Sequence, residues 1–522
     1  MRIGIDVGGT NTDAVLMNGA ELLAKLKTPT TSDVMSGIAT AIHSLLKSSG
    51  VDRAALTAVM IGTTHFTNAL VERRRLAPTA ILRLGRPATQ SVDPFDDWPE
   101  DLRASIGGKW RLAHGGNEFD GRELSALDPA EITRLVRELV AGGVESLAVA
   151  AVFSPVVPDM EKRVAEIVAQ EAPQLTVTLS HEIGGQGLLE RENAAAINAA
   201  LRPLATATVS SFRRSLAELG IKAPLYLTQN DGTLLMADTA ERYPVLTFAS
   251  GPTNSMRGAA FLSGLSDALV LDVGGTTSDF GALVHGFPRA SSVAATFGDV
   301  RTNFRMPDLI SFGLGGGSIV RGEQPTLGPD SVGYAITERA LVFGGDVLTA
   351  TDLAVAGGRA QIGNAALVSR VDRSLAQRGL AAMRRMMEDA LDRIKLARHP
   401  EPLIVVGGGT ILVDDELAGA SRIVRPKHFE VANAVGAAIA QVSGELDQIE
   451  PLADGRERIL ERSRTTAINR AIANGAVPAS VQIVEIDDAP VPYMEERMLR
   501  VRVKAIGELA AASVADSIAP AT

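Results

Sequence analysis

The chain has 522 residues, which is too long for one ordinary hydrophobic core, so two or more domains are expected. Apolar residues make up 46% and charged residues 21%, the balance of a soluble globular protein, and the net charge of −10 argues against nucleic acid as a partner. The absence of cysteine excludes disulfides, thiolate catalysis and cysteine-ligated zinc.

The chain opens with a predicted strand over residues 3–7 and shows no signal-peptide pattern. No uninterrupted apolar run reaches about 18 residues, so no membrane span is expected and a cytoplasmic location is inferred. Apolar residues at helical spacing then predict a helix over 32–49, which Gly50 ends.

The following segments alternate between strand and helix, which predicts an α/β fold with helices covering a sheet. Asp128 and Pro129 mark the start of one helix. Expected after it are a strand at 147–153, a helix near 158–170, a strand at 175–179, a helix at 192–219, strands at 225–228 and 268–273, a helix at 379–398, a strand at 403–406 and a helix at 433–442.

The tail and one internal stretch have a different character. Residues 481–486 and 499–506 alternate with period two and predict two strands joined by a turn at Pro490 and Pro492. Residues 85–125 are rich in Gly, Pro and Asp, which favours either a surface or substrate-facing insertion or an ordinary long loop. The domains are therefore expected at 1–190 and 191–455, with a small β-containing appendage at 456–522.

One eight-residue segment occurs twice. Residues 6–13 read DVGGTNTD and residues 272–279 read DVGGTTSD, and each copy follows a short apolar strand. A near-match placed after a strand at two distant positions indicates a duplicated building block.

The repeated segment has the chemistry of a phosphate-binding loop. Paired glycines let the backbone turn sharply and present its N–H groups to an anion, and the Thr hydroxyls add donors. Asp6 and Asp272 cannot face phosphate without repulsion, so both are predicted to bind Mg²⁺ or its water shell. The alternative is a pair of hairpins whose glycines serve only the turns. The predicted phosphate ligands are Gly8, Gly9, Thr10, Thr12, Gly274, Gly275, Thr276 and Thr277, and the candidate catalytic carboxylates are Asp6, Asp13, Asp272 and Asp279.

A third glycine cluster, Gly407, Gly408 and Gly409, follows another predicted buried strand, and such flat backbone suits the face of an adenine or a ribose. The small residues of 432–438 suit close helix packing and a connection between two lobes.

These motifs, in this order, resemble those of the actin-like ATPase superfamily, which includes actin, sugar kinases and heat-shock chaperones. The resemblance implies two duplicated actin/ribonuclease-H-like α/β domains with ATP and Mg²⁺ in the interdomain cleft. Competing nucleotide signatures, such as the P-loop and the dinucleotide-binding fingerprint, do not occur.

Five further segments resemble the A-type, ATP-binding subunit of the hydantoinase/oxoprolinase family. They are 61–73 (IGTTHFTNALVER), 228–233 (TQNDGT), 248–252 (FASGP), 311–318 (SFGLGGGS) and 327–333 (LGPDSVG). The resemblance implies phosphoryl transfer from MgATP to the carbonyl oxygen of a cyclic amide of the hydantoin, 5-oxoproline or lactam type. Water then opens the ring, with the hydrolytic half on a B-type partner subunit.

The same segments supply the candidate substrate residues Thr63, Thr64, Asn68, Asn230, Asp231 and Ser250. Each could instead be a turn or cap residue, since these residue types are common there. His65 is interpreted as a surface or packing histidine, with proton transfer as the alternative.

Two departures from the family pattern bear on the substrate. The chain is shorter at its C-terminal end than long-form members, and Asn230-Asp231-Gly232 adds a carboxylate to a loop expected to read Asn-Gly-Gly. The rival functions are a small-molecule kinase of the sugar-kinase type, a ketone-carboxylase subunit and a nucleotide-switched regulatory ATPase. The sequence leaves a homo-oligomer open.

Overall fold

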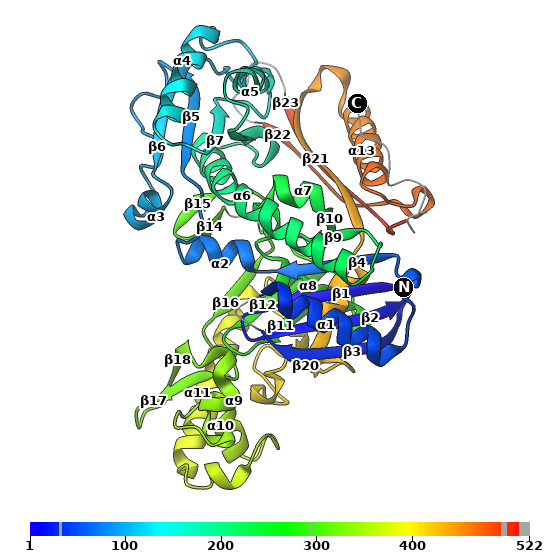
Figure 1. The fold of residues 1–522 in the computed structure, drawn as a ribbon. Helices are drawn as coiled ribbons and strands as arrows, with labels where there is room; N and C mark the ends of the chain where they lie inside the picture. The colour runs from blue at the N-terminus through cyan, green and yellow to red at the C-terminus, as the bar shows by residue number, and fades with distance from the viewer. Residues whose placement is uncertain (31–33, 292–293, 492–497, 511–522) are drawn as a thin grey trace.

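The computed structural model describes residues 1–30, 34–291, 294–491 and 498–510 (Figure 1). It contains both helices and strands throughout, so the predicted α/β class is confirmed. The helices are α1 (Val34–Ser49), α2 (His65–Val71), α3 (Glu100–Ser105), α4 (Pro129–Ala141), α5 (Asp159–Glu171), α6 (Leu188–Glu218), α7 (Ala237–Arg242), α8 (Ser250–Ser263), α9 (Ile336–Arg339), α10 (Ala350–Ala356), α11 (Arg373–Ile394), α12 (Ala432–Ile439) and α13 (Arg456–Ala473).

The largest sheet contains the first copy of the repeat. Its strand order is β22-β23-β21-β10-β9-β4-β1-β2-β3. Strand β1 pairs antiparallel with β2 and parallel with β4. The strands are β1 (Arg2–Val7), β2 (Asn11–Asn18), β3 (Glu21–Pro29), β4 (Ala58–Thr63), β9 (Leu225–Thr228), β10 (Leu234–Met236), β21 (Val442–Pro451), β22 (Gln482–Val491) and β23 (Met498–Gly507).

The period-two pattern of β1 decides what covers each face of this sheet. Ile3 and Ile5 are fully buried in one core cluster with Ile38 and Ile42 of α1. Gly4 points the other way, where a Cβ would lie only 2.2 Å from the carbonyl oxygen of Ala434 in α12. Asp6 shares the face of Gly4, so it lies on the side of α12.

The second sheet contains the other copy. Its order is β13-β12-β11-β19-β20, with β16 also paired to β12. Strand β11 pairs antiparallel with β12 and parallel with β19, as β1 does with β2 and β4. The predicted duplication is therefore confirmed. The strands are β11 (Ala268–Val273), β12 (Ser278–Val284), β13 (Phe287–Pro288), β16 (Leu309–Phe312), β19 (Glu401–Val406) and β20 (Ala420–Val424).

A smaller parallel sheet, β6-β5-β7-β8, lies with α4 and α5 at one end of the molecule, while α9, α10 and α11 lie at the other (Figure 1). The stretch 85–125 contains α3 and β6, and β6 pairs with β5 in this sheet. This part of the chain therefore has regular secondary structure and is not one long loop. The remaining strands are β5 (Thr79–Arg86), β6 (Lys109–His114), β7 (Ser146–Ala151), β8 (Thr176–Leu179), β14 (Ala295–Phe297), β15 (Val300–Thr302), β17 (Ser318–Arg321) and β18 (Thr326–Ser331).

The predicted tail strands are present as β22 and β23, and both extend the first sheet through β21. Pro492 and residues 32 and 33 of the predicted first helix lie outside the described residues. Helix α11 begins at Arg373, earlier than predicted, because the Asp372 side chain accepts the N–H of Leu375 at 2.8 Å and caps it. The domain boundaries at 190 and 455 stay predictions.

Helices α8 and α12 pack against each other with almost no side chain between them. A Cβ on Gly258 of α8 would lie 1.8 Å from the carbonyl oxygen of Ala432, and one on Gly436 of α12 would lie 1.8 Å from that of Asn254. The close packing predicted from the small residues of 432–438 is present. It brings Asn254 of α8 and Asn433 of α12 to the same side chain, that of Asp6 in β1.

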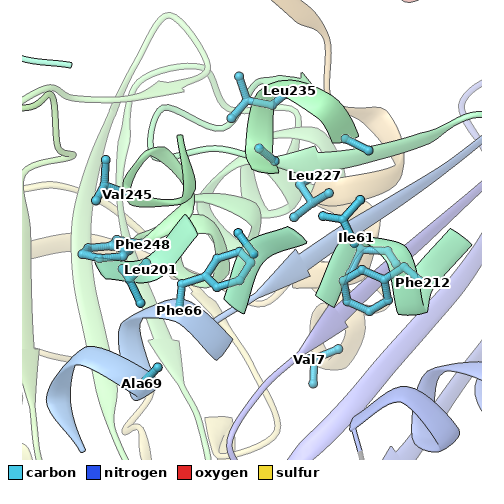
Figure 2. Close-up of a cluster of buried hydrophobic side chains, with 14 of the residues drawn as sticks. Val7, Ile61, Phe66, Ala69, Leu201, Phe212, Leu227, Leu235, Val245 and Phe248 are labelled. Atoms are coloured by element: carbon cyan, nitrogen blue, oxygen red, sulfur yellow. The ribbon is translucent and has the colours of Figure 1, made fainter. Parts of the chain in front are cut away.

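Helix α2 is held by its apolar side. Figure 2 shows Phe66 beside Leu201 and Phe248, and all three are buried in one core cluster. This anchor fixes the segment that carries Thr64 and Asn68. Among the described residues, no helix is long and apolar enough to cross a membrane.

Replacing Gly436 with Ala should lower the free energy of unfolding by about 1–3 kcal/mol, because its Cβ would overlap the backbone of α8. Urea unfolding measures this loss. The matched variant Gly251→Ala in α8, whose Cβ would lie 3.8 Å from Thr64 Cγ2, an ordinary contact, should unfold like the parent chain. Equal stability of the two variants would contradict the account of the helix crossing.

Candidate functional site

The two repeat copies form hairpins of the same geometry. The Gly8 N–H donates to the Asn11 carbonyl at 3.0 Å, and the Gly274 N–H donates to the Thr277 carbonyl at 2.9 Å. Asp6 lies opposite Asp13 in the first strand pair, as Asp272 lies opposite Asp279 in the second. Each copy is therefore a β-hairpin.

The two turns also face each other across one cleft of about 580 Å³. A Cβ on Gly275 would lie 2.5 Å from the Thr10 hydroxyl oxygen, so the turns nearly touch. The predicted site residues that line this cleft are Asp6, Gly8, Gly9, Thr10, Asp13, Thr64, Asp272, Gly274, Gly275, Thr276, Thr277, Asp279, Gly407, Gly408 and Gly409. Thr12 is buried beside it, with its hydroxyl 3.3 Å from that of Thr30.

Backbone donors remain open at the turns. Within the described residues, the N–H groups of Gly9, Thr10 and Gly275 make no hydrogen bond to the protein. The second turn is braced from behind, since the Gly274 and Gly275 carbonyls accept the N–H groups of Gly316 and Gly317 at 3.0 and 2.7 Å. Rigid, unpaired N–H groups on both sides of a cleft suit an anion such as a phosphate.

Asp6 is held by two amide side chains from the crossing helices. Its Oδ1 accepts from Asn254 Nδ2 at 3.0 Å and its Oδ2 accepts from Asn433 Nδ2 at 3.1 Å. Asn433 also donates to Asp13 Oδ2 at 2.9 Å. Burial raises the pKa of Asp6 to about 7, although the hydrogen bond from Asn254 opposes the shift.

The second copy repeats the arrangement with hydroxyl donors. Ser255 of α8 donates to Asp272 Oδ2 at 2.5 Å, and Ser311 donates to Asp279. Burial raises the pKa of Asp272 and that of Asp279, the latter to about 6. Asp13 differs because Lys27 Nζ lies 2.7 Å from its Oδ1, yet burial still raises its pKa.

These carboxylates fit a hydrated magnesium ion. Among the described residues Asp6 and Asp272 accept side-chain hydrogen bonds only from neutral donors and form no ion pair, although the charge of Lys27 opposes the rise in the pKa of Asp272. No cluster of three His, Asp or Glu able to hold a metal occurs in the described part of the chain. Magnesium is commonly held by one or two carboxylates with waters and phosphate oxygens, which suits this donor set.

The third glycine cluster lines the same cleft beside Asp272. Gly407 has φ +90°, and a Cβ there would lie 2.2 Å from Asp272 Oδ1, so the position needs glycine. The Gly409 N–H donates to the Val273 carbonyl at 2.7 Å and ties the cluster to β11. Apolar side chains also line the cleft and suit a planar base, namely Ile336, Phe343, Ile362, Ile411 and Phe429.

A second cavity of about 550 Å³ adjoins the first turn and shares Gly8, Gly9 and Thr64 with the cleft. The predicted substrate residues Thr63 and Asn68 also line it. The structure therefore brings three of the six predicted substrate residues together beside the turn of the first hairpin. His65 lines this cavity too, and burial lowers its pKa, which favours the neutral ring.

The other three predicted substrate residues lie elsewhere. Ser250 is fully buried, accepts the Thr63 N–H at 3.2 Å and donates to the Thr63 carbonyl at 3.1 Å, so it fixes the end of β4. Asn230 accepts the Ala249 N–H at 2.8 Å. Asp231 is paired with Lys504, and both Asn230 and Asp231 line a separate cavity of about 220 Å³. Their hydrogen bonds are those of residues that hold turns together.

Sequence reasoning missed the residues that hold the carboxylates, namely Lys27, Asn254, Ser255, Ser311 and Asn433. Asn254 and Ser255 follow the FASGP segment after Thr253, and their small polar character was a weak signal. Nothing in their spacing shows that α8 and α12 cross at Asp6. Lys27 lies on a strand whose exposure alternates, where a lysine is ordinary.

The chain resembles known proteins over most of its length. The family model "Hydantoinase/oxoprolinase N-terminal region" matches residues 2–172, and the model "Hydantoinase/oxoprolinase" matches residues 191–367. The chain is 26% identical over 471 residues to the caprolactamase subunit alpha of Pseudomonas jessenii. The matched region covers 84% of this chain and 65% of that one.

Two further relatives agree with this assignment. The acetophenone carboxylase gamma subunit of Aromatoleum aromaticum is 25% identical over 393 residues, which is 67% of this chain and 52% of that one. The chain thus spans about half to two thirds of the length of these curated relatives. The crystal structure of the ATP-dependent caprolactamase from Pseudomonas jessenii has the same fold, with a TM-score of 0.76 at 19% identity over 98% of this chain and 88% of that chain.

Since two models of one family match successive regions that together exceed half of the chain, this protein belongs to the hydantoinase/oxoprolinase family.

Proposed function

We propose that the chain is an ATP-dependent subunit that activates the carbonyl of a cyclic amide, of the hydantoin, 5-oxoproline or lactam type, by phosphoryl transfer from MgATP. One observation carries the proposal. Two matched glycine-rich turns face each other over four carboxylates, and a second cavity opens beside the first turn. A site of this shape suits transfer between two bound molecules.

The residues have separable roles in this proposal. MgATP would supply the phosphoryl group and a divalent charge. The open N–H groups of Gly9, Thr10 and Gly275 donate to phosphate oxygens, and this preorganised stabilisation needs no rearrangement during transfer. Asp6 and Asp272 hold the metal through its water shell.

The substrate is expected in the cavity beside the first turn. Thr63, Thr64 and Asn68 offer short hydroxyl and amide groups there, which suit the oxygen and nitrogen of a cyclic amide. Their position next to Gly8 and Gly9 holds the carbonyl oxygen near the end of the phosphate chain, so that positioning supplies much of the rate enhancement.

A partner subunit is part of the proposal. The similar caprolactamase and acetophenone carboxylase chains are both named as subunits, and this chain spans 65% and 52% of their lengths. We expect a B-type partner to complete ring opening, with the chain in the cytoplasm. Its similarity to the acetophenone carboxylase subunit supports activation of a ketone carbonyl as the second candidate function.

Phosphate release from MgATP should rise when a cyclic amide is added to the purified chain, because an occupied cavity places an acceptor beside the first turn. A panel of lactams, hydantoins, ketones and sugars, with phosphate measured by a coupled assay, distinguishes the candidates. Stimulation by ketones alone would favour the second candidate. Stimulation by sugars alone would contradict the proposal and favour a kinase.

The variants Asp6→Asn and Asp272→Asn should each lower MgATP turnover by about 100-fold or more, since each removes a proposed metal-holding charge from the cleft. Both variants should keep the circular dichroism spectrum of the parent. Asp415→Asn, which changes a carboxylate that is 94% exposed, is the matched control and should be fully active. Unchanged turnover in both cleft variants would refute the metal assignment.

The affinity for MgATP should fall as the pH drops below 7. The pKa of Asp6 is about 7 in the empty cleft, so below this pH a proton must leave before the carboxylate can serve a metal. A loss of up to about tenfold per pH unit is expected between pH 7 and pH 5. Calorimetry in buffers of different ionisation enthalpy should detect proton release on binding, and its absence at pH 6 would contradict the role of Asp6.

A further inference from the structure

The cavity beside the first turn contains a cation that the proposed mechanism does not use. Arg75 lines this cavity together with His65, Asn68 and Glu72. Within the described residues Arg75 forms no ion pair, and its one side-chain hydrogen bond joins its Nη1 to His65 Nε2 at 3.2 Å. A guanidinium has five N–H donors, so most of those of Arg75 stay available to a ligand.

The hydrogen bond between Arg75 and His65 determines how the His65 ring is protonated and how the guanidinium is oriented. Arginine can only donate, so His65 Nε2 is the acceptor and the ring is neutral at this atom. The histidine therefore orients the guanidinium without neutralising it. Helix α2 is anchored in the core through Phe66, which gives His65 a fixed base.

Glu72 supplies the opposite charge to the same cavity. It makes no ion pair with Arg75 or with any other cation among the described residues. A cation and an anion that line one cavity without meeting suit a ligand that has an acceptor for one and a donor for the other. A cyclic amide with a carboxylate on its ring has both, because its ring nitrogen carries a proton for Glu72 and its carboxylate suits Arg75.

The geometry points to a substrate of this class: we propose that Arg75, oriented by His65, binds a carboxylate on the cyclic amide and makes the enzyme prefer anionic over neutral rings. This inference rests on the proposed function and narrows its substrate. Thr63, Thr64 and Asn68, which also line the cavity, then remain for the carbonyl oxygen of the amide.

Two compounds with the same ring test the preference. 5-Oxoproline is 2-pyrrolidinone with one added carboxylate. The ratio kcat/KM for stimulated phosphate release should be about ten- to 100-fold higher for 5-oxoproline, through a lower KM, as expected for a charged hydrogen bond at a partly exposed site. The assay uses the full chain, with MgATP saturating.

Variants of Arg75 separate its role from a structural one. Arg75→Gln should raise the KM for 5-oxoproline until the two compounds are used about equally, and Arg75→Lys should keep part of the preference. Arg74→Gln changes an exposed neighbour that does not line the cavity and is the control. If Arg75→Gln fails to fold, the Arg75→Lys variant and the wild-type ratio still decide the question.

The outcomes for this inference and for the proposed function differ. Equal use of both compounds by the wild-type chain, or an undiminished preference in Arg75→Gln, would overturn the inference while cyclic-amide activation stands. Failure of every cyclic amide to stimulate phosphate release would overturn both.

Discussion

The rest of the site depends on the backbone contact between α8 and α12. Gly258 and Gly436 let the two helices approach until a Cβ on either would overlap the other helix. That approach places Asn254 and Asn433 on the two oxygens of Asp6, and Ser255 on Asp272. Because one helix pair serves both sheets, a shift of either helix would alter both halves of the cleft together.

The contact between α8 and α12 also explains how the carboxylates of the cleft are held. Four carboxylates lie at the ends of two strand pairs, Asp6 and Asp13 buried and Asp272 and Asp279 half-buried, and loss of solvation raises the pKa of each. A folded chain tolerates such charges when hydrogen bonds hold them and a counter-ion can enter. Here neutral amides and hydroxyls hold Asp6 and Asp272, which leaves their charge available, whereas Lys27 already neutralises Asp13. The donor chemistry therefore separates Asp13, which a lysine pairs, from Asp6, Asp272 and Asp279, whose side-chain donors are all neutral.

The duplicated hairpins could be predicted from the sequence because the eight-residue repeat records both the strand end and the turn. The glycine cluster at 407–409 could be predicted for the same reason, since the conformations open to a backbone segment depend on its own residues. Hydrogen-bond partners that come from distant segments could not be predicted in this way. Asn230 and Ser250 have the residue types of substrate ligands, but their hydrogen bonds close a turn and a strand end. Asn254 and Asn433 look ordinary in sequence, and only the helix crossing brings them to Asp6.

Strand β1 shows the same limit of prediction from sequence, because alternating side chains point to opposite faces of the sheet. Its pattern predicts a buried strand, yet only the packing of α12 against Gly4 reveals which face Asp6 shares.

Co-crystallisation with Mg²⁺ and a non-hydrolysable ATP analogue tests the central claim most directly. The account predicts phosphate oxygens between the turns at Gly8–Thr10 and Gly274–Thr276, with the metal next to Asp6 and Asp272. A nucleotide bound outside this cleft, or a metal that contacts neither carboxylate, would contradict it.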